Sequence, residues 1–107
     1  MFTGLTITFL KEFGTGLWLT FPLLFSLTAV IVVLGQLIGK KEGWTHLDSF
    51  YWSFITATTV GYGDLRPTRT PSRLGAILIA FLGLLLSGII IAIAVRSGTV
   101  ALAAAGA

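Results

Sequence analysis

The segment of this chain best suited to chemistry would use its backbone rather than its side chains. Glycine recurs at alternate positions in Thr59-Val60-Gly61-Tyr62-Gly63. Glycine adopts mirror-image backbone conformations at little cost, so alternate glycines allow successive carbonyl groups to point to the same side. Rings of such carbonyls, together with the Thr59 hydroxyl, can replace the water that a cation sheds. A Gly-x-Gly pair alone is weak support for such a site, because glycine-rich turns are common.

The composition indicates that a membrane surrounds most of the chain. The 107 residues are 55% hydrophobic and only 10% charged, which is too little charge to cover a soluble domain of this size. The chain has no cysteine, so disulfides and thiolate metal sites are excluded. Its single histidine, His46, cannot assemble a metal site within one chain. The net charge of +3 is scattered, without the basic run that nucleic-acid binding requires. No grouping of nucleophile, base and orienting residue suggests an enzyme.

Two apolar stretches are long enough to cross a bilayer as helices, which takes roughly 20 residues. The first covers residues 17–39, and the second is an uncharged run from about Leu74 to Val95 within a helix expected at 73–98. Neither shows the alternation of a β-barrel strand. We therefore predict an all-α membrane protein with one main domain over residues 17–98.

The parts outside this domain are short. Residues 1–16 are mixed and weakly amphipathic, which predicts a segment lying at the membrane surface. Residues 99–107 are rich in alanine and glycine and form a short C-terminal tail. The opening residues lack a basic region and a cleavage site, so a removable signal peptide is not expected.

A short helix and a glycine-rich loop are expected between the two spans. Thr45 and Asp48 have the spacing of a capping box, which predicts the start of a helix over residues 46–58. This helix is apolar and aromatic in the middle but too short to span. Non-helical backbone such as residues 59–63 is tolerated at membrane depth only where it lines a polar cavity. The pattern is typical of a re-entrant loop.

The segment Thr58-Thr59-Val60-Gly61-Tyr62-Gly63-Asp64 resembles the signature of the potassium channels, without a substitution. The resemblance is to the two-transmembrane-helix pores of the prokaryotic family, and it extends from about Trp44 to Val95. It implies an outer helix at 17–39, a pore helix at 46–58, a filter at 59–63 and an inner helix at 73–98. It also implies a homotetramer in a membrane that conducts K⁺ passively, without a cofactor. The K⁺ ions would lie at Thr59, Val60, Gly61 and Tyr62.

The resemblance also implies residues that support the filter. In the family, the aspartate at the position of Asp64 braces the filter from behind, and the indole of a pore-helix tryptophan commonly donates to it. Trp52 is expected to be this donor, because buried indoles usually need a partner; simple aromatic packing is the alternative. Ile55 stands where some relatives have a glutamate, so an acid pair with Asp64 cannot form.

The second span carries the residues expected to act in gating. Gly83 falls at the position of the family's gating hinge, although small residues also allow close helix packing in membranes. Ser87 and Ile91 are expected to line the inner cavity, and Val95 or Thr99 to narrow its cytoplasmic mouth.

The distribution of basic residues conflicts with the orientation that the resemblance implies. Five lysines and arginines lie between the spans and two on the terminal side, which alone would place the loop in the cytoplasm. The resemblance instead places both termini in the cytoplasm and the filter outside the inner (plasma) membrane. We follow the resemblance, because a re-entrant loop complicates the count.

Two alternative functions remain open. The first is a weakly selective cation channel, which the intact Tyr62-Gly63 pair disfavours. The second is a non-conducting accessory membrane protein whose loop only resembles a filter.

Overall fold

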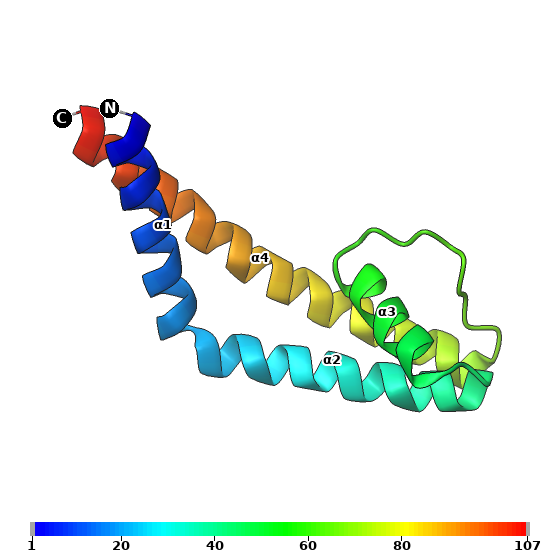
Figure 1. Ribbon diagram of the computed structural model, residues 1–107. Helices are drawn as coiled ribbons and strands as arrows, with labels where there is room; N and C mark the ends of the chain where they lie inside the picture. The colour runs from blue at the N-terminus through cyan, green and yellow to red at the C-terminus, as the bar shows by residue number, and fades with distance from the viewer. Residues whose placement is uncertain (1, 107) are drawn as a thin grey trace. The chain divides into compact units, whose positions relative to one another are not determined.

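The chain is helical throughout most of its length. The computed structural model describes residues 2–106, which form the helices α1 (Phe2–Leu19), α2 (Phe21–Glu42), α3 (His46–Ala57) and α4 (Thr70–Gly106) (Figure 1). None of these residues forms a strand. Helices α2 and α4 are each long and apolar enough to cross a membrane. The all-α class and the two spans are confirmed.

The described residues divide into two compact units. The first unit comprises residues 25–87, and therefore most of α2, all of α3 and the first half of α4. Its core contains Ile31 of α2, Trp52 and Ile55 of α3, and Ile79 of α4, all at most 9% exposed. Figure 1 shows α3 beside the end of α2 and the start of α4. The short helix is thus held by both long ones.

The ends of α2 and α3 have recognisable capping structures. Helix α2 ends at Glu42, and the next residue, Gly43, has a φ of 78°, the left-handed conformation that glycine adopts easily. The N–H of Trp44 then donates to the carbonyl of Gly39 over 2.8 Å, which is the long bond of a Schellman motif. Helix α3 begins after Thr45, whose hydroxyl accepts from the N–H of Asp48 over 3.1 Å, as the capping pattern predicts.

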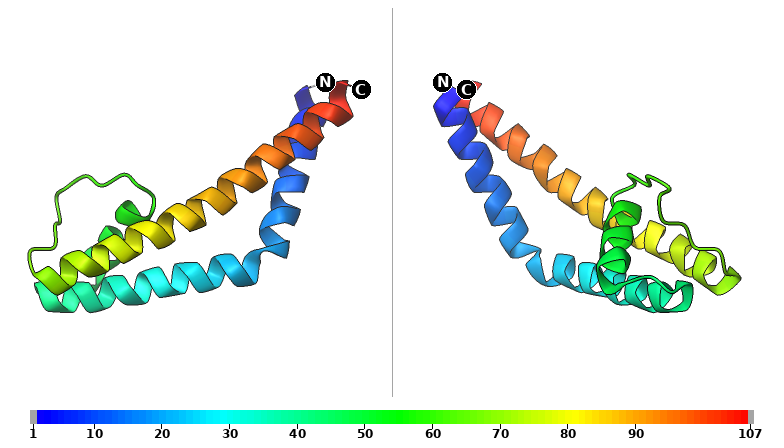
Figure 2. Two further views of the ribbon diagram at one scale, coloured as in Figure 1. Left: turned by 180° about the vertical axis from the view of Figure 1, so that it is seen from behind. Right: turned by 45° about the vertical axis from the view of Figure 1, so that its right-hand side comes forward.

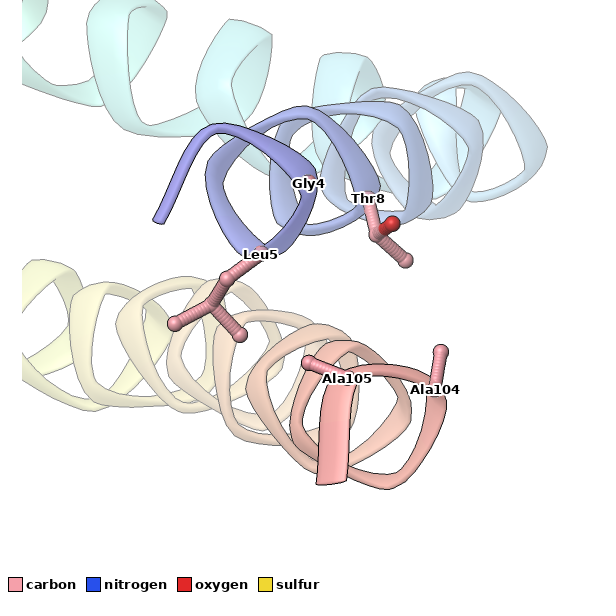
Figure 3. A pocket seen from close by; sticks show the side chains of 5 residues that line it. All are labelled: Gly4, Leu5, Thr8, Ala104 and Ala105. Atoms are coloured by element: carbon pink, nitrogen blue, oxygen red, sulfur yellow. The ribbon is translucent and has the colours of Figure 1, made fainter. Parts of the chain in front are cut away.

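The second unit comprises the described residues up to 24 and from 88 onward. Here α1 lies beside the last part of α4, which Figure 2 shows from two further sides. Leu5 and Thr8 of α1 face Ala104 and Ala105 of α4 across a pocket of about 200 Å³ (Figure 3). That α1 lies at the membrane surface stays a prediction.

Two helix boundaries differ from those expected. The first apolar stretch was expected as one helix over 17–39, but α1 continues to Leu19 and α2 begins at Phe21. Pro22 explains the restart, since proline lacks an N–H and suits the first turn of a helix. The last helix begins at Thr70 and continues to Gly106, so the tail at 99–107 is helical as far as Gly106. The alanines of this segment explain the extension, because alanine has the highest helix propensity.

Candidate ion-binding filter

The expected filter follows α3 directly and has an alternating backbone. Thr59, Gly61 and Gly63 have φ values of 66°, 55° and 83°. Every second residue of the segment therefore lies in the left-handed region, as the positions of the two glycines predict. Thr59 adopts this conformation without being a glycine, which costs an L-residue about 1–2 kcal/mol. Backbone strain of this kind is concentrated at functional sites.

Hydrogen bonds to the end of α3 hold the first residues of the filter, Thr59 to Gly61, in place. The N–H of Gly61 donates to the carbonyl of Ile55 over 3.0 Å, and the N–H of Thr59 donates to the carbonyl of Thr56 over 3.2 Å. Thr58 caps the helix with its N–H. Because these bonds join the filter to the last turn of α3, the position of α3 determines where the filter lies.

The side chains of the filter are not covered within one chain. Val60 is 50% exposed and Tyr62 is 71% exposed. The Thr59 hydroxyl donates to the carbonyl of Thr58 over 2.6 Å, and a hydroxyl oxygen that donates its proton can still accept through its lone pairs. The segment thus offers a row of backbone oxygens and one hydroxyl.

Asp64 is braced by Tyr51 rather than by Trp52. The Tyr51 hydroxyl donates to Oδ2 of Asp64 over 2.9 Å, and Oδ1 accepts from the N–H of Leu65 over 3.1 Å. The pKa of Tyr51 is raised, mainly by the hydrogen bond to Asp64 and to a smaller extent by desolvation and by the charge of the Asp64 carboxylate. The hydroxyl therefore stays protonated and able to donate at physiological pH.

The prediction that Trp52 donates to Asp64 was wrong, because neighbouring residues on a helix face directions about 100° apart. Trp52 points into the core, where it is 3% exposed and its ring lies 5.2 Å from that of Trp44. This packing holds α3 in the core. Ile55 is also part of this core.

Glu42 joins the end of α2 to the loop between the filter and α4. Its Oε1 accepts from the N–H and the hydroxyl of Thr68 over 2.7 and 2.9 Å, and its Oε2 accepts from the N–H of Arg69 over 3.3 Å. A carboxylate here also suits the positive end of the α4 dipole. The sequence alone did not indicate this role, because Glu42 and Thr68 lie 26 residues apart.

We expect Glu42→Gln to loosen this loop. Glutamine keeps the size of the side chain but loses the charge and one of the two acceptor oxygens, so the bonds to Thr68 and Arg69 weaken. Limited proteolysis with trypsin should then cleave after Arg69 several-fold faster than in the wild type. Glu12→Gln, on α1, is the matched control; equal cleavage of Glu42→Gln and wild type would contradict the role of Glu42.

Gly83 lies against the end of α3. A Cβ built on Gly83 would overlap the carbonyl oxygen and Cα of Ala57 and lie 2.7 Å from its carbonyl carbon. Gly83 is buried and α4 continues through it without interruption. The contact supports the packing interpretation of this glycine, and its role as a hinge stays a prediction.

The two expected cavity residues lie one turn apart on α4. Ser87 is half-buried and Ile91 is 61% exposed. That the two residues line a cavity stays a prediction.

The comparisons with known proteins agree with this geometry. Residues 17–99 match a protein family described as "Ion channel". TWiK family of potassium channels protein 7 from Caenorhabditis elegans is 45% identical over 64 residues, which cover 56% of this chain and 12% of that protein. Potassium channel protein 1 from Methanocaldococcus jannaschii is 33% identical over 54 residues, covering 50% of this chain and 16% of the relative.

A plant relative gives the same result. Two pore potassium channel a from Oryza sativa subsp. japonica is 38% identical over 69 residues, covering 64% of this chain and 20% of the relative. The chain thus spans a fifth or less of the length of these three relatives. No solved structure matches the chain significantly. Since the matched segment runs from the end of α1 through the filter and most of α4, the chain belongs to this ion channel family.

Proposed function

We propose that this chain is one subunit of a homotetrameric potassium channel, which conducts K⁺ passively and selectively across a membrane. The observation that carries the proposal is the alternating backbone at Thr59, Gly61 and Gly63, directly after a short helix between two spans. Such a backbone turns successive carbonyls to one side, where they can replace the hydration shell of K⁺. The potassium channels among the relatives support this choice of ion.

The exposed filter side chains support an assembly of several copies. One chain supplies only one arc of each oxygen ring, and cyclic symmetry is the usual way to close a ring. Val60 and Tyr62 are at least half exposed, although apolar and aromatic side chains that hold a filter at fixed width need cover. Neighbouring subunits would provide that cover. Four copies match the arrangement that the resemblance implies.

The helix before the filter contributes to the electrostatics of the proposed pore. Asp48 lies in the first turn of α3, where a negative charge is favourable. The other end of α3 carries a partial negative charge and precedes Thr59, so it would favour a cation in the cavity below the filter. Ser87 and Ile91 would line that cavity. We place the tetramer in the plasma membrane with both termini in the cytoplasm.

Flux measurements test the proposal directly. The protein, reconstituted into liposomes, should pass K⁺ much faster than Na⁺ and be blocked by Ba²⁺, and chemical cross-linking should give a tetramer. Comparable Na⁺ flux would indicate a weakly selective cation channel. A protein that carries no current and does not form tetramers would be an accessory membrane protein, and either result would overturn the proposal.

Removal of the Tyr51 hydroxyl should destabilise the conducting filter. Tyr51→Phe keeps the ring but removes the donor to Asp64, and a charge-assisted hydrogen bond is stronger than a neutral one. We expect K⁺ current to decay several-fold faster during sustained opening, which planar bilayer recordings would measure. Phe50→Tyr, at the neighbouring position, is the control. Unchanged decay in Tyr51→Phe would show that the bond does not hold the filter.

A further inference from the structure

Two buried serines of α3 fit against two glycines of α2. Ser49 and Ser53 are 1% and 0% exposed, and both lie on the same face of α3, one turn apart. Gly35 and Gly39 are also one turn apart and buried in α2. A Cβ on Gly35 would overlap Oγ of Ser53 and lie 2.9 Å from its Cβ. A Cβ on Gly39 would overlap Oγ of Ser49 and lie 2.7 Å from its Cβ.

The hydroxyl groups are satisfied within their own helix. Ser53 Oγ donates to the carbonyl of Ser49 over 2.7 Å, and Ser49 Oγ donates to the carbonyl of Thr45 over 2.8 Å. Each hydroxyl therefore occupies the space above a glycine without needing a polar partner on α2. The contact is one of shape, and small residues allow this close approach between helices in a membrane.

We infer that Gly35 and Ser53, with Gly39 and Ser49 one turn away, are positioning pairs that set the location of α3 and through it the ion selectivity of the filter. The inference rests on the proposed potassium conduction. Ser53 lies only two residues before Ile55, whose carbonyl holds the N–H of Gly61. A displacement of α3 is therefore passed to the filter oxygens.

The short distance between Gly35 and Ser53 leaves no room for a side chain at position 35. Two Cβ atoms cannot remain 2.9 Å apart, so alanine at position 35 must move α3 by about half an ångström or more, which is roughly the tolerance of a functional site. Such a shift changes the width of every oxygen ring, because all copies in a symmetric assembly carry the same substitution.

A double-mutant cycle tests the pair. Gly35→Ala should lower the ratio of K⁺ to Na⁺ flux in liposomes by roughly tenfold, the change that a small loss of discrimination energy produces. Gly35→Ala combined with Ser53→Gly removes the overlapping atoms, since the next neighbour of that Cβ is the carbonyl oxygen of Ser49 at 3.4 Å. The double variant should recover most of the flux ratio. An unchanged ratio in Gly35→Ala, or no recovery in the double variant, would overturn the inference.

The readouts separate positioning from mere stability. The unfolding temperature, measured in parallel, should be lower in Gly35→Ala than in the wild type. A purely structural contact would lower it but would leave the flux ratio of the folded tetramer unchanged. Gly88→Ala is the matched control, because a Cβ on Gly88 meets nothing within 4 Å.

If Gly35→Ala does not assemble, Ser53→Ala decides the question. This variant empties the space above Gly35 without a clash and should also lower the flux ratio, whereas an unchanged ratio would again overturn the inference. A wild type without selective K⁺ flux would instead refute the proposed function, so the two failures are distinguishable.

Discussion

Gly61→Ala is expected to abolish potassium-selective flux. The φ of Gly61 is 55°, and an L-residue pays about 1–2 kcal/mol for this left-handed conformation. Each copy would relieve that strain by turning the peptide, which takes a carbonyl out of the oxygen ring. Compared with the wild type, liposomes that contain the variant should lose most of the K⁺ flux or no longer discriminate against Na⁺. The helical content measured by circular dichroism should stay the same.

Gly43 provides a matched control for this prediction. Its φ is 78°, a Cβ there would meet nothing within 4 Å, as at Gly61, and it lies at the end of α2 outside the filter. Gly43→Ala should therefore carry similar backbone strain and lower the unfolding temperature without changing selectivity. Selective flux that survives Gly61→Ala, or is lost equally in Gly43→Ala, would contradict the role assigned to the alternating backbone.

Gly83→Ala is expected to have the second largest effect. The added methyl group would overlap backbone atoms of Ala57, which cannot rotate away as a side chain can, and overpacking of this kind costs about 1–3 kcal/mol or more. The end of α3 would move away from α4, and the filter would move with it. Single-channel recordings should show conductance and open probability both reduced several-fold, and the tetramer should unfold at a lower temperature.

A second variant distinguishes close packing from hinge flexibility. Leu84 is exposed, so Gly83→Ala combined with Leu84→Gly restores a flexible residue to α4 without restoring the space at Ala57. If packing is what matters, the double variant stays as impaired as Gly83→Ala. Recovery of normal opening in the double variant would instead identify Gly83 as a hinge.

Local patterns predicted the elements around the filter well. Thr45 caps α3 as the Thr45 and Asp48 spacing indicates, and Gly61 and Gly63 have the positive φ values that their alternation requires. Each of these features depends on a few adjacent residues and on backbone preferences that hold in any surroundings. The two apolar spans are equally local, since length and hydropathy decide them.

The contacts between distant residues could not be predicted in the same way. The choice of Tyr51 over Trp52 as the partner of Asp64 depends on the rotation of α3 about its axis, which Gly35 and Gly39 help to set. Glu42 reaches Thr68 across 26 residues, and no local pattern indicates that pairing. The spacing of Gly35 and Gly39 is the one available signal, because Gly-x-x-x-Gly in an apolar stretch marks a close helix contact.

The most direct test of the account is a high-resolution map of the assembled protein in potassium chloride. The account predicts four chains around one axis, with ion density on that axis between rings of oxygens from Thr59, Val60, Gly61 and Tyr62. Carbonyl groups of residues 59–62 that point away from the axis, with no ion density between the chains, would contradict it.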